Sequence, residues 1–290
     1  MTTKRKSTNP DFNSPQFPTW CPGCGDFGIW TSLKNALAEL GWQPSDVLIV
    51  YGIGCSGNMA SFVRTYGFHG LHGRALPVAI GAKLANRDLK IIVIGGDGDG
   101  YGEGGNHFLH ALRGNVDITY IVHDNQVYGL TKGQMAPTTE RGQKTSSTPE
   151  GVIEQPLNPV ALAIAAGGSF VAQGFAGDTG QLTQLIKAGI EHPGFAHVNV
   201  LQPCVTFNHH NTYSWFYDRV YKLDGAGHDF SNKHEAFARA LEWGEKIPTG
   251  ILYREIRDTY EQAVPEMKAE PLVKERLDTI DISPTLKLLA

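Results

Sequence analysis

Short apolar runs alternate with amphipathic segments of helix length along much of the chain. The runs rich in β-branched and aromatic residues predict buried strands at Val47–Tyr51, Ile91–Ile94, Ile118–Val122, Ser169–Gln173 and Phe195–Leu201. Segments with apolar residues at helical spacing predict helices at Phe27–Leu40, Leu76–Leu84, Leu157–Ala166 and Thr179–Glu191. Strands that alternate with helices predict an α/β fold with an open, mostly parallel sheet flanked by helices.

Acidic and amide side chains follow two of these strands. Asp97 and Asp99 lie in a glycine-rich turn after the second strand, and Asn125 lies 28 residues after Asp97, at the end of the third. Ligands bind at this edge of an open α/β sheet. Oxygen ligands suit Mg²⁺, and glycines such as Gly96 and Gly98 let the backbone approach a pyrophosphate closely. The pattern therefore predicts a site for Mg²⁺ and a pyrophosphate.

Four cysteines form a second candidate site. Cys21 and Cys24 make a C-x-x-C turn before a helix, Cys55 and Ser56 follow a strand, and Cys204 follows another strand. Four thiolates suit Zn²⁺ and a [4Fe-4S] cluster equally well on count. Two of the four are single cysteines far apart on an α/β scaffold, whereas a structural zinc site usually draws on two C-x-x-C pairs. The spacing therefore favours a cluster.

Two further segments carry candidate chemistry. His72 and Arg74 lie in a glycine-rich loop; such side chains are often only surface groups, and the functional alternative is contact with a phosphate or a substrate carboxylate. The irregular stretch after Asn125 is of a length that is usually functional, and residues 138–150 are polar enough to form a flexible lid. His209 and His210 have no further partner at metal-ligand spacing.

Composition excludes several classes of protein. The chain has 290 residues, 41% of them hydrophobic, and a formal net charge of only −4, which gives no indication of a nucleic-acid-binding surface. No apolar run approaches the roughly 20 residues of a membrane helix. The first residues are basic and then rich in Pro, Asn and Ser, without the apolar segment of a secretory signal. Cytoplasmic location is the default expectation, and there thiols usually stay reduced.

Changes in composition suggest three regions. Residues 1–18 are expected to form an extended N-terminal arm, residues 19–207 the α/β domain, and residues 208–290 a C-terminal extension that packs on the domain and on a partner subunit. The extension begins with an aromatic-rich segment expected to be extended and to contact another surface. Lys233–Lys246 has the periodicity of an amphipathic helix.

The longer wording of these motifs resembles one enzyme family. G-D-G followed by an Asn at this distance looks like the thiamine diphosphate motif, and GDGD…GGNHFLHALRGNVDI…DNQVYGLTKGQ resembles the β subunit of 2-oxoacid:ferredoxin oxidoreductases. CPGCG, IGCSG and PCVTFN look like the three cysteine segments of that family's proximal [4Fe-4S] cluster. The resemblance covers roughly residues 17–260. One departure is Asp124-Asn125 in place of the usual Asn-Asn pair.

The resemblance implies roles for individual residues. Asp97, Asn125 and the backbone carbonyl of Val127 would hold Mg²⁺, and the cysteines would hold the cluster. Lys132 would lie by the thiamine ring and the substrate. The candidate catalytic residues are therefore Lys132, from the resemblance, and His72, from its place in the glycine-rich loop. Contact with the cofactor is expected from Cys55, Ser56, His72, Gly96, Asp97, Gly98, Asp99, Asn125, Val127, Gly129, Leu130 and Thr131.

The activity implied by the resemblance is oxidative decarboxylation of a 2-oxoacid. Thiamine diphosphate would supply the reactive carbon, the cluster would accept electrons singly, and coenzyme A would accept the acyl group, giving acyl-CoA, CO₂ and reduced ferredoxin. Only one pyrophosphate-type domain is visible, so the resemblance implies an α subunit in an α₂β₂ complex. The substrate expected first is 2-oxoglutarate, with pyruvate or a broad range of 2-oxoacids as alternatives.

Two other hypotheses remain open at this point. One is a non-redox thiamine diphosphate-dependent decarboxylase or synthase subunit whose cysteines hold structural zinc. The other is a structural zinc-binding module that uses its glycine turns only for packing.

Overall fold

The strands of the protein form one large sheet in the computed structural model, which describes residues 8–268, 270–276, 278 and 280–289. Within these residues the sheet has eight strands in the order β2-β1-β3-β4-β8-β7-β10-β9. Their bounds are β1 Val47–Tyr51, β2 Tyr66–His69, β3 Lys90–Gly96, β4 Thr119–Asp124, β7 Phe170–Phe175, β8 Ala196–Leu201, β9 Val220–Lys222 and β10 Ile247–Arg254. Only the β10–β7 pair is antiparallel, and the expected α/β fold with a mostly parallel sheet is confirmed.

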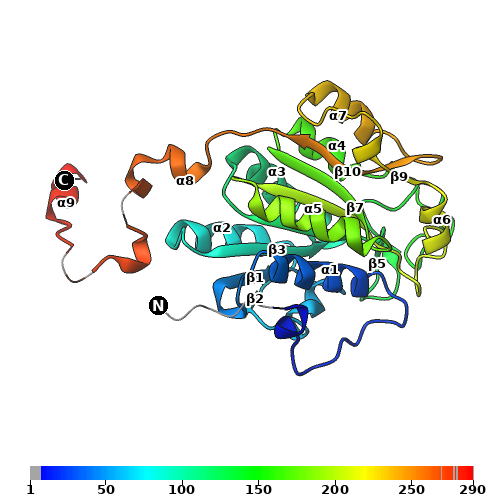
Figure 1. The fold of residues 1–290 in the computed structure, drawn as a ribbon, viewed down its shortest axis with the longest axis horizontal. Helices are drawn as coiled ribbons and strands as arrows, with labels where there is room; N and C mark the ends of the chain where they lie inside the picture. The colour runs from blue at the N-terminus through cyan, green and yellow to red at the C-terminus, as the bar shows by residue number, and fades with distance from the viewer. Residues whose placement is uncertain (1–7, 269, 277, 279, 290) are drawn as a thin grey trace.

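Helices cover both faces of the sheet (Figure 1). One face packs against α1 (Asp26–Glu39) and α5 (Thr179–Glu191), which also contact each other. The other face is covered by α2 Ala75–Ala85, α3 Gly105–Gly114, α4 Pro159–Ala165 and α7 Lys233–Ala240. The central strands β4, β7 and β8 are buried along their whole length, which explains why their sequences read as continuous apolar runs.

Smaller elements complete the fold. The short strands β5 (Val127–Tyr128) and β6 (Gln134–Met135) form a hairpin just past the end of β4. The remaining α-helices are α6 Tyr213–Tyr217, α8 Tyr260–Ala263 and α9 Ser283–Leu289. The segment after β10 runs away from the sheet and ends in α9, whose residues are not buried (Figure 1). No helix in the described part of the chain is long and apolar enough to cross a membrane.

The N-terminal arm was expected to be extended, and residues 1–7 lie outside the described residues. From residue 8 on, the arm packs on its own domain. Phe12 is fully buried in the core beside α1, and the Asn9 side chain donates to the Asn35 side-chain oxygen at 2.6 Å. The arm therefore contributes to the core.

Two local expectations after residue 207 were wrong, and one strand was not predicted. The aromatic-rich segment is not extended throughout, because it forms α6. The helix from Lys233 ends at Ala240 and not at Lys246. Residues after it form β10, which the sequence did not suggest because Pro248 and Gly250 interrupt its apolar pattern. Because β9 and β10 belong to the main sheet, the chain after residue 207 completes the domain's core; the proposed boundary at 207 stays a prediction.

Candidate cofactor and cluster site at the carboxyl edge of the sheet

The predicted site residues converge because the strands that carry them are neighbours. β1, β3, β4 and β8 are consecutive in the sheet, and their carboxyl ends lie at one edge. A cavity of about 80 Å³ opens there. All twelve residues expected to contact the cofactor line it, together with Ile53, Gly54, His123 and Tyr128. The structure thus brings these residues together, while their roles stay predictions.

Asp97 lies at the floor of this cavity and is 2% exposed. One of its oxygens accepts a hydrogen bond from the Thr138 hydroxyl at 2.6 Å. Burial and the negative charge of the neighbouring Asp124 raise the pKa of Asp97, and burial also raises that of Asp124. Two buried carboxylates side by side without a cation are unfavourable. A divalent ion at Asp97 would offset that cost, so the site fits the predicted Mg²⁺.

Asn125 is the second predicted Mg²⁺ ligand, and its carboxamide oxygen is of the right kind for that ion. Its Oδ1 accepts from the backbone N–H of Val127 at 3.1 Å, and Gln126 between them adopts φ +60°, which turns the chain back on itself. A carboxylate, a carboxamide oxygen and a backbone carbonyl suit Mg²⁺. No three His, Cys, Asp or Glu side chains in the described ranges form a metal site by geometry alone. The predicted Mg²⁺ set contains only one carboxylate, so that finding does not test it.

Asp99 has a different place from Asp97. Its Oδ1 accepts from the backbone N–H groups of Gly73 at 2.8 Å and Ile53 at 3.0 Å. A Cβ on Gly52 would lie 1.9 Å from the other oxygen of Asp99, so this position requires glycine. Asp99 therefore holds three loops together at the cavity wall, and its contact with the cofactor stays a prediction.

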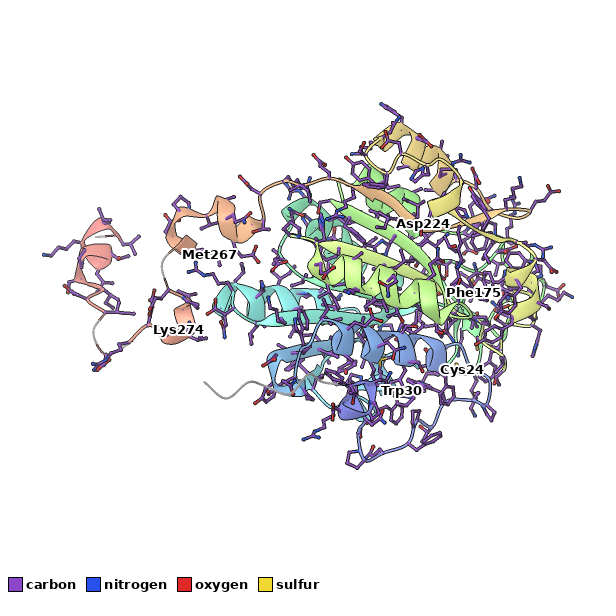
Figure 2. All side chains as sticks on the ribbon, viewed as in Figure 1. Cys24, Trp30, Phe175, Asp224, Met267 and Lys274 are labelled. Atoms are coloured by element: carbon purple, nitrogen blue, oxygen red, sulfur yellow. The ribbon has the colours of Figure 1, made fainter. Side chains whose placement is uncertain are left out.

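The four cysteines are free thiols at the same end of the sheet. Cys24 lies just before the N-terminus of α1 (Figure 2). Cys24 and Cys204 are buried, Cys55 is half-buried, and Cys21 is exposed. A Cβ built on Gly129 would lie 3.5 Å from the sulfur of Cys55 and 3.7 Å from that of Cys204. The sulfurs of Cys55 and Cys204 therefore lie next to the wall of the cavity, which Gly129 lines.

Burial favours the protonated form of Cys24, Cys55 and Cys204. It raises the pKa of Cys55 to about 12 and raises those of Cys24 and Cys204 as well, with neighbouring acidic groups, including Asp26, adding to the effect. A positively charged iron centre would reverse this preference, because thiolates bind it and release their protons. Cys55 interacts electrostatically with Cys21 and Cys204, and Cys24 does so with Cys204. Thiols fit the predicted [4Fe-4S] cluster in their chemistry, although no three of the described cysteine, histidine or acidic side chains are already arranged to hold a metal.

Two candidate catalytic residues differ in their placement. His72 lines the cavity, and its Nδ1 lies 3.6 Å from Asp99 without forming a hydrogen bond. Lys132 is exposed, adopts φ +76°, and is not among the residues that line the cavity. Arg74 donates to the backbone carbonyl of Glu103 at 2.9 Å. His210 pairs with Glu140 at 3.3 Å outside the cavity.

Sequence reasoning missed two buried polar residues beside the site. His123 lines the cavity and is 1% exposed; its Nδ1 lies 2.6 Å from Asp26, and its Nε2 has no hydrogen-bond partner. Gln202 contacts both Asn125 and Cys24. A polar residue within an apolar strand, as in YIVHD, and one immediately before Pro203-Cys204 were the available signals.

Comparison with known proteins agrees with this arrangement. Two family models match: the C-terminal TPP-binding domain of thiamine pyrophosphate enzymes over residues 52–200, and the C-terminal part of the pyruvate ferredoxin oxidoreductase beta subunit over residues 204–269. A 2-oxoacid:ferredoxin oxidoreductase subunit beta from a Sulfolobus species is 48% identical over 264 residues, which covers 87% of each chain.

Two further relatives bear on the substrate. The 2-oxoglutarate oxidoreductase subunit KorB of Mycobacterium tuberculosis is 45% identical over 207 residues, 71% of this chain and 56% of that protein. A solved 2-oxoglutarate:ferredoxin oxidoreductase from Magnetococcus marinus, with 2-oxoglutarate, coenzyme A and succinyl-CoA bound, has a TM-score of 0.91 and 39% identity, covering 99% of this chain and 97% of that one. This chain belongs to the β-subunit family of the 2-oxoacid:ferredoxin oxidoreductases.

Proposed function

We propose that the chain is the β subunit of a 2-oxoglutarate:ferredoxin oxidoreductase. The complex would convert 2-oxoglutarate, coenzyme A and oxidised ferredoxin to succinyl-CoA, CO₂ and reduced ferredoxin, reversibly. The observation that carries the proposal is the single cavity that joins Asp97 and Asn125 to Gly129, where two cysteine sulfurs adjoin the wall. The 2-oxoglutarate named for the Magnetococcus enzyme and the KorB relatives support the choice of substrate.

The residues of this chain would hold three groups at one edge of the sheet. Asp97, Asn125 and the Val127 carbonyl would hold Mg²⁺, and the glycine turn after β3 would take the pyrophosphate. Cys21, Cys24, Cys55 and Cys204 would hold a [4Fe-4S] cluster. Thiamine diphosphate, when bound, supplies the carbon that attacks a 2-oxoacid and retains its electrons after CO₂ leaves. Because the sulfurs of Cys55 and Cys204 lie next to the cavity wall at Gly129, electrons could pass from the cofactor to the cluster at this edge.

The proposal includes an α subunit, an α₂β₂ assembly and ferredoxin as partner. Exposed apolar side chains along the C-terminal segment support a subunit contact there, among them Leu272, Val273, Ile282 and Leu286. It also includes a cytoplasmic location, which four thiols without disulfide bonds favour. We expect little activity from this chain without its partner.

The test uses the complex purified with its α subunit under exclusion of oxygen. We expect a brown protein with broad absorbance near ~400 nm, and coenzyme A-dependent reduction of ferredoxin that is faster with 2-oxoglutarate than with pyruvate. Equal or faster rates with pyruvate would reject the substrate. A colourless complex containing zinc, active without an electron acceptor, would instead support the non-redox alternative.

A further inference from the structure

Gln202 lies between the two halves of the site. It follows β8 directly and is 1% exposed. Its Oε1 accepts a hydrogen bond from Asn125 Nδ2 at 2.8 Å. Its Nε2 donates to the sulfur of Cys24 at 3.3 Å and to the backbone carbonyl of Pro203 at 3.2 Å. One carboxamide therefore contacts both a predicted Mg²⁺ ligand and a predicted cluster ligand.

Backbone groups at both ends of this series of hydrogen bonds determine which amide atoms donate and which accept. The Val127 N–H can only donate, so the atom of Asn125 that it contacts is the oxygen, and the nitrogen of Asn125 faces Gln202. The Pro203 carbonyl can only accept, so the atom of Gln202 near it and near Cys24 is the nitrogen. Either amide turned around would place two donors or two acceptors together.

Close packing leaves Gln202 little freedom to turn. A Cβ on Gly25 would lie 2.7 Å from Gln202 Cγ, so the helix N-terminus can approach only because residue 25 is glycine. The Gly25 N–H donates to the Pro203 carbonyl at 3.1 Å, and the Gln202 N–H donates to the Asp124 carbonyl at 2.9 Å. The backbone on either side of the carboxamide is thus fixed.

We propose that Gln202 is a positioning residue that serves both the Mg²⁺ half and the cluster half of the site, an inference that rests on the proposed function. Through Oε1 it turns Asn125 so that Oδ1 faces the metal. Through Nε2 it gives the sulfur of Cys24 an N–H donor, and hydrogen bonds to cluster sulfurs are one determinant of reduction potential. The other contact of that sulfur is the Asp26 carboxyl group at 3.2 Å.

A purely structural role would give a different result. A buried carboxamide that only satisfies its neighbours would lower stability when replaced, but it would leave the potential of an intact cluster unchanged. The two roles of Gln202 can also be separated from each other. Gln202→Met removes both hydrogen-bonding groups, whereas Gln202→Glu keeps an acceptor for Asn125 and removes the donor to Cys24.

The experiment compares wild type, both variants and a control in the complex with the α subunit. Gln173 is a buried carboxamide in β7 that donates to the Pro248 carbonyl and has no contact with a cysteine, so Gln173→Met is the matched control. The readouts are the midpoint potential of the cluster, measured by redox titration without thiamine diphosphate, and the Mg²⁺ dependence of thiamine diphosphate binding, measured by calorimetry.

We expect both Gln202 variants to lower the potential. A tenfold change in the one-electron reduction equilibrium corresponds to about 59 mV. Gln202→Met should also weaken Mg²⁺ binding about 10- to 100-fold, as loss of an outer-shell partner typically does, while Gln202→Glu should retain most of it. A full cluster with unchanged potential in both variants overturns the inference. An iron-free wild-type complex overturns the proposed function instead. If Gln202→Met does not assemble, the potential of Gln202→Glu decides.

Discussion

Replacing Asp97 by Asn should stabilise the cofactor-free protein while abolishing its response to Mg²⁺. Asp97 and Asp124 are 2% and 4% exposed, and neither forms an ion pair within the described residues. Asn has the shape of Asp, and its oxygen can still accept from Thr138. Burial keeps Asp97 protonated in the folded state at a pH where the unfolded chain ionises it. Asn removes this cost of proton uptake, which should stabilise the fold by on the order of 3 kcal/mol at neutral pH. At about 2–4 °C per kcal/mol this is a rise in Tm of several degrees.

The sign of the pH dependence follows from the raised pKa of Asp97. The folded state holds a proton that the unfolded chain releases above about pH 4, so the wild type loses stability as the pH rises from there. The difference between variant and wild type should therefore be near zero at about pH 4 and should grow toward neutral pH. An isoelectronic replacement at an exposed position, Asp224→Asn, is the control and should change nothing.

Thermal unfolding of the cofactor-free complex, followed with and without Mg²⁺ and thiamine diphosphate, measures both effects. The wild type should gain stability when the two ligands are added, and Asp97→Asn should not. A variant that melts below the wild type at neutral pH without ligands, or that keeps the ligand-induced rise, would refute the interpretation of Asp97 as a buried carboxylate that requires a cation.

Three further outcomes can be measured on the same complex. Gly129→Val should lower iron content and visible absorbance, because its side chain would extend toward the two adjoining cysteine sulfurs; full iron occupancy would contradict this. Burial lowers the pKa of His192 to about 4 and of His197 to about 3, so the unfolded chain binds protons that the folded one does not. Stability should fall below about pH 6.5, by about 3 kcal/mol for each histidine at pH 4, and His192→Gln should reduce the slope measured in urea titrations. His123→Leu should cost on the order of 3–5 kcal/mol by leaving Asp26 buried without its partner; adding Asp26→Asn should recover part of it, and a double variant no more stable than the single one would contradict the pairing.

The central strands could be predicted because their burial on both faces leaves a continuous apolar signature. The strands β1, β3, β4 and β8 all had this signature, and their carboxyl ends define the site. β10 lacked this signature, because Pro248 and Gly250 interrupt its apolar run. Its place between β7 and β9 depends on contacts with residues distant in the chain.

Residues of the site could be predicted only where they stand in short sequence motifs. Asp97, Asn125 and the cysteines stand in short motifs, and the resemblance to a family assigned them roles. His123 and Gln202 have no such motif, because their partners Asp26 and Cys24 lie 97 and 178 residues away in sequence. Lys132 stays a prediction: its position just outside the cavity is a consequence of the turn after β5, which periodicity does not describe.

The central claim is that Mg²⁺ and an iron–sulfur cluster share one edge of a single sheet. Diffraction from crystals of the αβ complex, collected at and below the iron absorption edge, tests it most directly. The account predicts an anomalous iron peak bonded to the sulfurs of Cys21, Cys24, Cys55 and Cys204, and a divalent ion bound by Asp97 and Asn125. Iron placed elsewhere, zinc at the cysteines, or no ion at Asp97 would contradict it.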